Sequence, residues 1–401
     1  MMNTSPCRRL LQTAALAIAV HLTLLASASA QEPEFRLVLD REFGGMEDAE
    51  LQVTSIPLMA VSAHGQLAVP LRTSRQVALI DVDSGELRVV GREGRGPGEI
   101  ARLSNVGFAG DTLWVVDPSL GRVTHFPPDG SAPELTSAQG VIERGEGFLI
   151  PLPLTDELIL SSRRMVSSAD GGAQEIHGRE LFNMTGDWEV RTRLVELRPE
   201  LERLRLVHES VRSVQLGPHP FSVHPLFAYA PGVGSIVVAR RADDPGRPIP
   251  AADVTRIGPA GDTIFHVALP PALPEHRGPI EGETIDAIVE YWVSIPQLLE
   301  RFPSAAVIRS GIEEGLDPPA RHPPATQLVL GIDGRTWVRG PDPWTGSVVW
   351  QVLDEEGVVV ARARADRAIE GLAADEHGLW GVVLEELDVP RIARFRLEPI
   401  P

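Results

Sequence analysis

Three histidines lie close together in the sequence, and histidine is a common zinc ligand. His208, His219 and His224 fall within one segment, in which prolines flank His219 and follow His224. Their spacing is not the His-Glu-x-x-His spacing that places two ligands on one face of a zinc-binding helix. Proline-flanked histidines are typical of surface or packing positions in loops. We therefore predict no metal site in this segment.

Nucleophilic catalysis leaves no signature in the sequence either. No Gly-x-Ser-x-Gly elbow is present, and the only cysteine, Cys7, lies before the predicted start of the mature chain. The chain contains no lysine, which excludes Schiff-base chemistry. Adjacent carboxylates such as Asp243-Asp244 are expected to be solvated in a chain with a formal charge of −18. A Ser-His-Asp triad that the fold assembles from distant positions stays open.

Two short motifs resemble ligand-binding loops. Asp81-Val82-Asp83-Ser84-Gly85 lacks the full Asp-x-Asp-x-Asp-Gly pattern of a calcium loop, and we interpret it as a hairpin turn. Gly91-Arg92-Glu93-Gly94-Arg95-Gly96-Pro97-Gly98-Glu99-Ile100 lacks the Gly-Lys-Ser/Thr ending of a phosphate loop, and no helix is expected after it. Gly-x-Gly-Pro-Gly continues neither a helix nor a strand, so this run predicts a compact crossover.

The glycine-rich run also supplies candidate ligand-binding residues. Arg92, Arg95 and Glu99 are expected either to support the crossover or to contact a ligand at one face of the fold, where an arginine fork suits a carboxylate or phosphate. Trp344, between prolines and a glycine, is a candidate for an exposed contact that stacks on a sugar or a peptide.

Strand–turn–strand units recur along the chain and must position these residues. Their turns lie near residues 64, 110, 156, 234, 334 and 378. The short intervals match a four-stranded propeller blade of about 40–50 residues, and the two long intervals require insertions. Trp114, Trp337 and Trp380 occupy the same second-strand position, which indicates core packing between blades. The sequence predicts an all-β, six-bladed β-propeller of four-stranded antiparallel blades.

The ends and insertions of this propeller can also be predicted. The last unit is one strand short, and residues 35–43 are expected to supply that strand and close the ring. Short apolar runs before each turn, including one that begins at Asn105, are expected to line a central channel. Residues 283–301 have helical spacing within a proline-rich insertion at about 270–325, and Leu201, Leu204, Val207 and Val211 suggest another short helix.

The glycine-rich run resembles the connector of bacterial six-bladed propellers of the NHL-like type, with Ile100 in place of a usual phenylalanine. Residues 110–126 and Asp333–Val338 are similar to the same family. This resemblance implies a secreted or periplasmic propeller, and it carries no catalytic residues. Most members of the family have no assigned activity.

The first thirty residues predict export. Arg8 and Arg9, an apolar stretch and Ala28-Ser29-Ala30 form a secretory signal peptide over residues 1–30, followed by one propeller domain over residues 31–401. Loss of the two arginines takes the formal charge from −18 to −20, which disfavours nucleic acid and anionic membranes as partners. No later segment is apolar enough for stable membrane insertion. A chain that closes its own ring is expected to be a monomer in the periplasm or outside the cell.

Two functions fit these observations. The first is a non-catalytic propeller that binds a protein, peptide or glycan partner at one face, without a cofactor. The alternative is a hydrolase or lactonase with calcium or another divalent metal in the central channel, as the gluconolactonase-type propellers suggest. Those enzymes use Glu, Asn and Asp side chains, whereas the mature chain has only Asn105 and Asn183 as asparagines, and this counts against the alternative.

Overall fold

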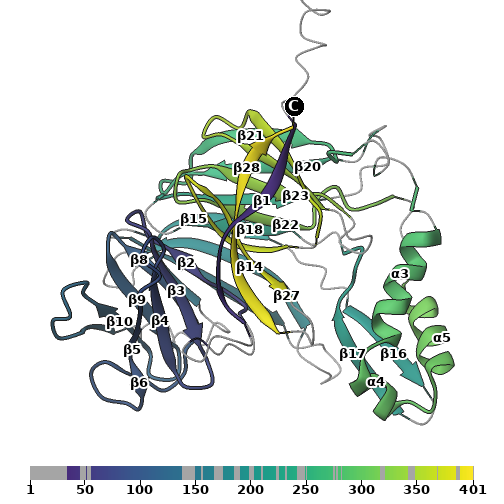
Figure 1. Ribbon diagram of the computed structural model, residues 1–401, viewed down its shortest axis with the longest axis horizontal. Helices are drawn as coiled ribbons and strands as arrows, with labels where there is room; N and C mark the ends of the chain where they lie inside the picture. Colours follow the sequence, from purple (N-terminus) through teal and green to yellow (C-terminus); the bar gives the residue numbers. More distant parts are fainter. Residues whose placement is uncertain are drawn as a thin grey trace, which may run out of the picture.

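The computed structural model describes residues 34–45, 51, 56–137, 150–154, 157–166, 175–184, 190–197, 203–208, 211–222, 225–230, 233–241, 249, 251–273, 276, 279–280, 282–316, 321–341, 348–367, 369–384 and 389–400. Most of these residues form β-strands (Figure 1). The predicted signal peptide lies outside the described residues. None of the helices in the described part of the chain is long and apolar enough to cross a membrane.

Four antiparallel sheets of four strands follow one another along the chain. The first contains β2 (Ala60–Val61), β3 (Gln66–Leu71), β4 (Gln76–Asp81) and β5 (Leu87–Val90). The second contains β8 (Asn105–Ala109), β9 (Thr112–Asp117), β10 (Arg122–Phe126) and β11 (Glu134–Ser137). The third contains β12 (Ile150–Leu154), β13 (Glu157–Val166), β14 (Glu175–Met184) and β15 (Val190–Leu197). The fourth contains β18 (Leu226–Tyr229), β19 (Ile236–Arg240), β20 (Ala252–Ile257) and β21 (Thr263–Leu269).

The last two units share one sheet of eight strands, in the order β22-β23-β24-β25-β1-β28-β27-β26. Its first half contains β22 (Gln327–Leu330), β23 (Thr336–Arg339), β24 (Val348–Leu353) and β25 (Val359–Ala365). Its second half contains β26 (Glu370–Asp375), β27 (Gly378–Leu384), β28 (Pro390–Pro399) and the first strand of the chain, β1 (Glu34–Gly44). The two halves are antiparallel within themselves.

Strand β1 supplies the strand that the last unit lacks, as the sequence predicted, and adds a second contact. It pairs antiparallel with β28 along most of its length, as Figure 1 shows. Residues 34–36 also pair in parallel with residues 362–364 of β25. The sequence predicted only the pairing with the last unit. The amino-terminal strand therefore joins two neighbouring sheets and covers the outer edge of both, which removes unpaired backbone groups from the surface.

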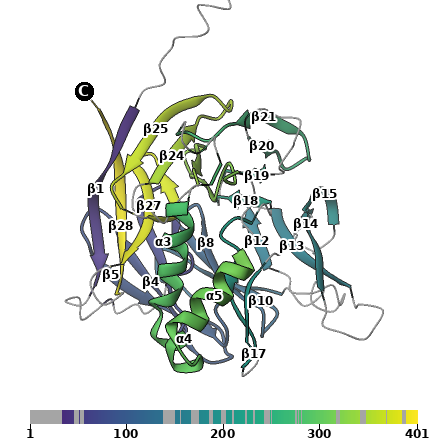
Figure 2. The same cartoon turned by 90° about the vertical axis from the view of Figure 1, so that its right-hand side faces the viewer.

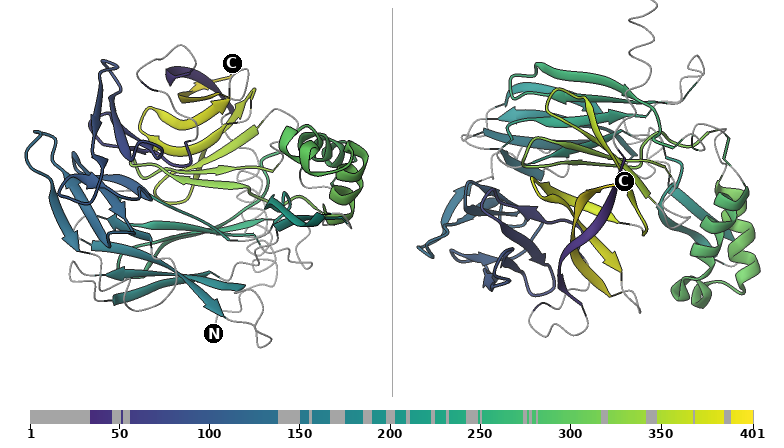
Figure 3. Two further views of the ribbon diagram at one scale, coloured as in Figure 1. Left: turned by 90° about the horizontal axis from the view of Figure 1, so that it is seen from below. Right: turned by 45° about the horizontal axis from the view of Figure 1, so that its top comes forward.

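The innermost strands lie next to one another. β2 contacts both β8 and β26, β8 contacts β12, and β22 contacts both β18 and β26. Figure 3 shows the sheets succeeding one another in sequence order around the molecule. Four-stranded antiparallel sheets whose first strands meet at a common centre define a β-propeller.

Burial changes from the inner to the outer strands of a sheet. The four central residues of β3 and of β4 are fully buried, whereas β5, β21 and β25 alternate or expose their side chains. A strand between two neighbouring sheets buries both faces and therefore consists of a nearly continuous apolar run. An outer strand faces solvent on part of its surface and keeps the period-two pattern.

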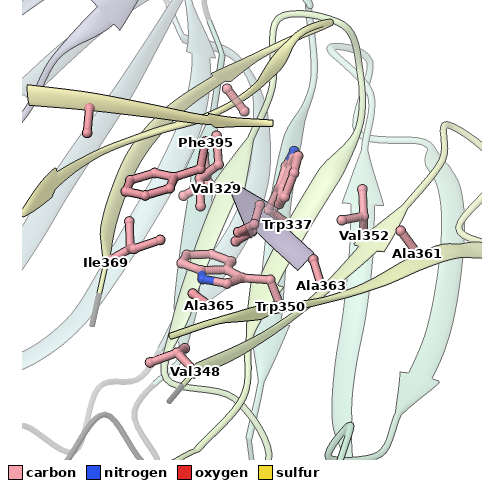
Figure 4. Packing of buried hydrophobic residues seen from close by; sticks show 14 of the residues in the cluster. Val329, Trp337, Val348, Trp350, Val352, Ala361, Ala363, Ala365, Ile369 and Phe395 are labelled. Atoms are coloured by element: carbon pink, nitrogen blue, oxygen red, sulfur yellow. The ribbon is translucent and has the colours of Figure 1, made fainter. Parts of the chain in front are cut away.

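Tryptophans fill the layers between the sheets, as their repeated position predicted. Trp114, Trp337 and Trp380 have no exposed surface, and Trp350 of β24 is equally buried. In the cluster drawn in Figure 4, the rings of Trp337 and Trp350 meet edge to face, with 6.4 Å between their centroids. This geometry is favourable for aromatic rings and adds to the energy of burial.

Two insertions form a side unit apart from the sheets. It contains a hairpin of β16 (Arg203–His208) and β17 (Val211–Pro218) together with α3 (Gly282–Val293), α4 (Pro296–Arg301) and α5 (Ala305–Leu316). Figures 1 and 2 show these elements side by side. Apolar residues from both insertions share one cluster: Leu204, Leu206, Phe221, Ile288, Val289, Leu298, Phe302, Ile308, Ile312 and Leu316.

The side unit confirms one helix prediction and corrects another. Residues 283–301 are helical as predicted, with a break before Pro296. The predicted helix through Leu201, Leu204, Val207 and Val211 is wrong, because the described part of this segment is the β16–β17 hairpin. Leu204 and Leu206 are both buried, so the apolar period here is two rather than 3.6 residues.

Candidate functional site

A cavity of about 270 Å³ lies where the innermost strands converge, and we call it the central cavity. Its lining comes from the segments that the sequence predicted as channel strands, Asn105 among them. Its apolar side chains include Leu58, Met59, Val106, Phe227, Val329, Leu330 and Leu372. Among the described side chains that line it, the polar ones are Asn105, Tyr229 and Gln327. Neither a carboxylate nor an imidazole is among them.

The polar residues of the central cavity hydrogen-bond mostly within the ring of strands. Gln327 Nε2 donates to the carbonyl of Gly371 at 2.7 Å, and the Gly371 N–H donates back to Gln327 Oε1 at 3.2 Å. Asn105 Nδ2 donates to the phenol oxygen of Tyr229 at 2.8 Å. Burial raises the pKa of Tyr229 to about 12. The phenol is therefore neutral and keeps a proton that it can donate.

A second cavity of about 410 Å³ lies at the turns that follow the innermost strands, and we call it the turn hollow. Its walls come from the β2–β3, β22–β23 and β26–β27 turns and from residues of β28 and the β4–β5 turn. The side chains that can carry a charge there are Asp83, Asp333, Asp375, Glu376, Arg394, His64 and His377. Four carboxylates thus face one guanidinium. Glu376, His64 and His377 are largely exposed, so the hollow opens to solvent.

Asp333 is a largely buried carboxylate of the turn hollow. Its side chain is 12% exposed, and its Oδ2 accepts no hydrogen bond from the described residues. Arg335 Nε lies 3.5 Å from that oxygen, which is an ion pair without a hydrogen bond. Burial raises the pKa of Asp333, and the nearby Asp375 raises it further. An ionised Asp333 therefore lacks the donor that a buried carboxylate requires.

Asp375 contrasts with Asp333, because its oxygens are occupied by neighbouring donors. Oδ1 accepts the backbone N–H groups of His377 and Gly378 at 2.9 Å each, and Oδ2 accepts Trp380 Nε1 at 2.7 Å. Arg394 lies 5.3 Å from the centre of the Trp380 ring, and its Nη1 is 3.8 Å from Asp375 Oδ2. Asp375 thus fixes one wall of the hollow, whereas Asp333 pairs, among the described residues, only with Arg335, whose backbone N–H donates to Asp333 Oδ1 at 3.1 Å.

The glycine-rich run forms a crossover outside both cavities. Its ends pair in parallel as β6 (Arg92–Glu93) and β7 (Glu99–Ile100). Glu99 accepts the backbone N–H groups of Gly96 at 2.7 Å and Arg95 at 2.8 Å, and its other oxygen pairs with Arg92 at 2.8 Å. These donors hold the pKa of Glu99 below its usual range. Arg122 donates to three carbonyls of the same loop.

The predicted site residues therefore do not all come together. Arg92 and Glu99 pair with each other inside the crossover, and they line neither cavity described above. Trp344 lies outside the described residues, as does His224. His219 joins the two insertions, since its Nε2 lies 2.6 Å from the carbonyl of Leu316. In the described part of the chain, no group of three or more His, Cys, Asp or Glu side chains is arranged to hold a metal.

The residues of the turn hollow were missed as ligand-binding candidates. His64, Asp333 and His377 occupy the hairpin turns that define the repeat, where Asp-Gly and His-Gly pairs are typical of tight turns. Asp81 and Asp83 belong to the predicted hairpin turn, in which Asp81 accepts hydrogen bonds from Ser84. The signal that could have revealed the site is positional. Polar turn residues recur at one place in several repeats, and the propeller brings three of these turns together in one hollow.

No family model matches the chain, and no curated protein matches it in sequence. A member of the DUF4221 family from Bacteroides vulgatus has a TM-score of 0.48 at 10% identity, over 92% of this chain and 100% of that one. Virginiamycin B lyase from Staphylococcus aureus, in a catalytically inactive form with quinupristin, has a TM-score of 0.41 at 10% identity, over 91% and 100%. The calcium-binding protein regucalcin from Agrobacterium tumefaciens has a TM-score of 0.41 at 9% identity, over 92% and 96%. At these values, their activities do not transfer to this chain.

Proposed function

We propose that this protein is an exported, monomeric six-bladed β-propeller that binds a peptide or protein partner through a basic side chain in the turn hollow. In this proposal, residues 1–30 are a signal peptide and residues 31–401 form one propeller domain. The eight-stranded sheet then counts as the fifth and sixth blades, joined by β1. The observation that carries the proposal is the 410 Å³ hollow, in which four carboxylates face one guanidinium.

The charge of the hollow favours some of the three predicted kinds of partner, which are a protein, a peptide and a glycan. Arg394, the one guanidinium of its lining, is already paired with Asp40 outside the hollow and lies near Asp375 within it. Of the carboxylates that line the hollow, Glu376 is largely exposed, and Asp333 pairs with Arg335 without a side-chain hydrogen bond. A guanidinium or ammonium group from a partner supplies hydrogen-bond donors and positive charge to a lining that holds four carboxylates and one guanidinium. A neutral glycan supplies no charge, so a basic peptide or protein is the better partner.

The overall charge supports the same class of partner. The chain carries a formal charge of −18, and its field attracts cationic molecules and raises their rate of association. The metal-dependent hydrolase alternative requires carboxylates in the central channel. The described lining of the central cavity offers amide, phenol and apolar groups instead. The geometry therefore favours the binding function over a hydrolase that holds calcium or another divalent metal in the channel.

The proposal can be tested with a pair of probes that differ only in charge. N-acetyl-arginine amide carries a guanidinium, and N-acetyl-citrulline amide is its neutral isostere. We expect calorimetry to detect binding of the arginine probe and not of the citrulline probe. Asp333→Asn should weaken that binding about tenfold or more, since it removes a charge-assisted hydrogen bond. Glu283→Gln, on the side unit, is the control and should leave it unchanged. Equal binding of both probes would overturn the proposal.

A further inference from the structure

The central cavity reaches the surface at the end where the innermost strands begin. Its lining there includes Pro57, Leu58, Phe227 and Gln327, which lie at or near the starts of β2, β18 and β22. Pro57 is exposed, so in the described part of the chain the lining continues to solvent at this end. The turn hollow lies at the opposite ends of β2, β22 and β26, beside the turns that follow them. A molecule can therefore enter the central cavity without crossing the hollow.

Tyr229 holds a hydrogen-bond donor that the described residues leave unused. Asn105 Oδ1 accepts the backbone N–H of Val106 at 3.0 Å, which leaves Nδ2 to donate to the Tyr229 phenol at 2.8 Å. The phenol oxygen is thus the acceptor in this contact, and no described residue accepts its own proton. Tyr229 lines the cavity and keeps part of its surface accessible, so the proton is available to a molecule held there. A hydroxyl in such surroundings is stabilised by an acceptor.

The other polar side chains of the lining define what kind of molecule fits. The amide oxygens of Asn105 and Gln327 already accept the backbone N–H groups of Val106 and Gly371. The described side chains therefore offer hydrogen-bond donors rather than free acceptors. They carry no charge, so an ion in the cavity would lose its hydration without gaining an opposite charge. These groups favour a neutral molecule that presents an acceptor, such as a carbonyl oxygen.

We infer that the central cavity binds a small neutral carbonyl compound, whose oxygen accepts the Tyr229 O–H and whose apolar body packs against Leu58, Val106 and Leu372. This inference goes beyond the proposed function, because it uses neither the turn hollow nor the charges that line it. The volume is sufficient for such a body, since an engineered cavity of about 150 Å³ holds benzene and the central cavity measures about 270 Å³.

Cyclohexanone and methylenecyclohexane test the inference, because a carbonyl oxygen in the first replaces a CH₂ group in the second. We expect ligand-observed NMR titrations to detect binding of both probes to the wild-type protein. The ratio of their affinities, ketone over alkene, should fall by about threefold to tenfold in Tyr229→Phe, which removes one neutral hydrogen bond. Tyr291→Phe, on the side unit, is the control and should leave the ratio unchanged.

Two further measurements locate the probe and do not depend on the folding of Tyr229→Phe. Leu372→Trp, which fills the cavity from β26, should weaken both probes about tenfold or more and leave binding of N-acetyl-arginine amide unchanged. The infrared carbonyl stretch of cyclohexanone bound to the wild-type protein should lie below its frequency in a hydrocarbon solvent, because a hydrogen bond weakens the C=O bond.

Several results would overturn the inference. They are failure of both probes to bind up to their solubility limits, the same affinity ratio in the wild-type protein and Tyr229→Phe, undiminished binding to Leu372→Trp, and a carbonyl frequency equal to that in hydrocarbon. None of them bears on the arginine probe, so the proposed function stands or falls separately.

Discussion

Arg394 of β28 holds Asp40 of β1 through two nitrogen atoms. Nη2 lies 2.6 Å and Nε 2.7 Å from the same carboxylate oxygen, Asp40 Oδ2. The contact joins the last strand of the chain to the first, at residues 354 positions apart in the sequence. Because Arg394 also borders the turn hollow, the closure of the ring and one wall of the candidate site depend on the same side chain.

Asp40→Ala should destabilise the protein by about 2 kcal/mol, because it leaves the buried Arg394 guanidinium without its main partner. Equilibrium unfolding in urea measures this loss as a lower free energy of unfolding. Glu398→Gln is the control, and it removes a carboxylate from β28, the strand of Arg394. The ion pair of Glu398 with Arg396 is about half exposed and should contribute at most about 1 kcal/mol. Equal effects of the two substitutions would contradict a closing role for Arg394.

Much of the propeller could be predicted because each unit carries local signals. The turn at Gly110-Asp111, the apolar run before it and Trp114 after it are all read from neighbouring residues. The pairing of β1 with β28 followed from one missing strand. The parallel pairing with β25 could not be predicted, since it depends on how two blades lie next to each other. The leucines and valines of the β16–β17 hairpin fit a helical period as well as a strand period, so the sequence alone predicts a helix there.

Gly107→Ala should destabilise the protein by about 3 kcal/mol. A Cβ at Gly107 would lie 2.1 Å from Cζ2 of Trp114, the residue that pairs with it on the next strand. Because Trp114 is fully buried, its ring has no room to move away. Thermal and urea unfolding report the change. Gly282→Ala has open space around the new Cβ and should have no effect or a small stabilising one. A stable Gly107→Ala variant would show that this layer packs differently.

Alkaline pH should destabilise the protein through Tyr229. Burial raises the pKa of this phenol from 10.0 to about 12 in the folded state, so the native protein holds the proton more tightly than the unfolded chain does. The resulting stability is fully present below pH 10 and is lost as the pH rises to about 12. Tyr229→Phe should remove this part of the pH dependence. It should also cost about 1–2 kcal/mol at neutral pH, because Asn105 Nδ2 loses its acceptor.

The measurement for Tyr229 is the free energy of unfolding as a function of pH, for the wild-type protein and for Tyr229→Phe. Tyr291→Phe is the control, since the Tyr291 side chain is half exposed on the side unit. Parallel curves for the wild-type protein and Tyr229→Phe between pH 10 and 12 would contradict burial of this phenol in the central cavity.

Asp333→Asn should make the protein more stable at neutral pH while it weakens ligand binding. Burial raises the pKa of Asp333 above its usual value, so its stabilising contribution is present below about pH 3.8 and is lost as the pH rises through the folded-state pKa. The asparagine keeps Oδ1, which accepts the Arg335 N–H at 3.1 Å, and it removes the charge. A higher melting temperature together with weaker binding of the arginine probe is the expected result. A destabilised variant would indicate that Asp333 serves the fold.

The candidate site was harder to predict than the fold. Arg92 and Glu99 stood out in the sequence because glycines surround them, yet they bind each other within the crossover. Asp333 and His377 look like ordinary turn residues, and they come together only because the ring brings successive turns to one face. The turns of a repeat can be predicted from neighbouring residues in the sequence. The surroundings of Asp333 cannot, because they include Asp375 from the next unit. Asn105 was placed near the channel correctly, because it begins an innermost strand.

A crystal structure of the wild-type protein with N-acetyl-arginine amide tests the central claim most directly, because it locates the bound cation. We expect the guanidinium in the turn hollow, within hydrogen-bond distance of at least one of its carboxylates, Asp83, Asp333, Asp375 or Glu376. Density for the probe at another face of the propeller, or an empty hollow at a probe concentration that saturates the protein in solution, would contradict the claim.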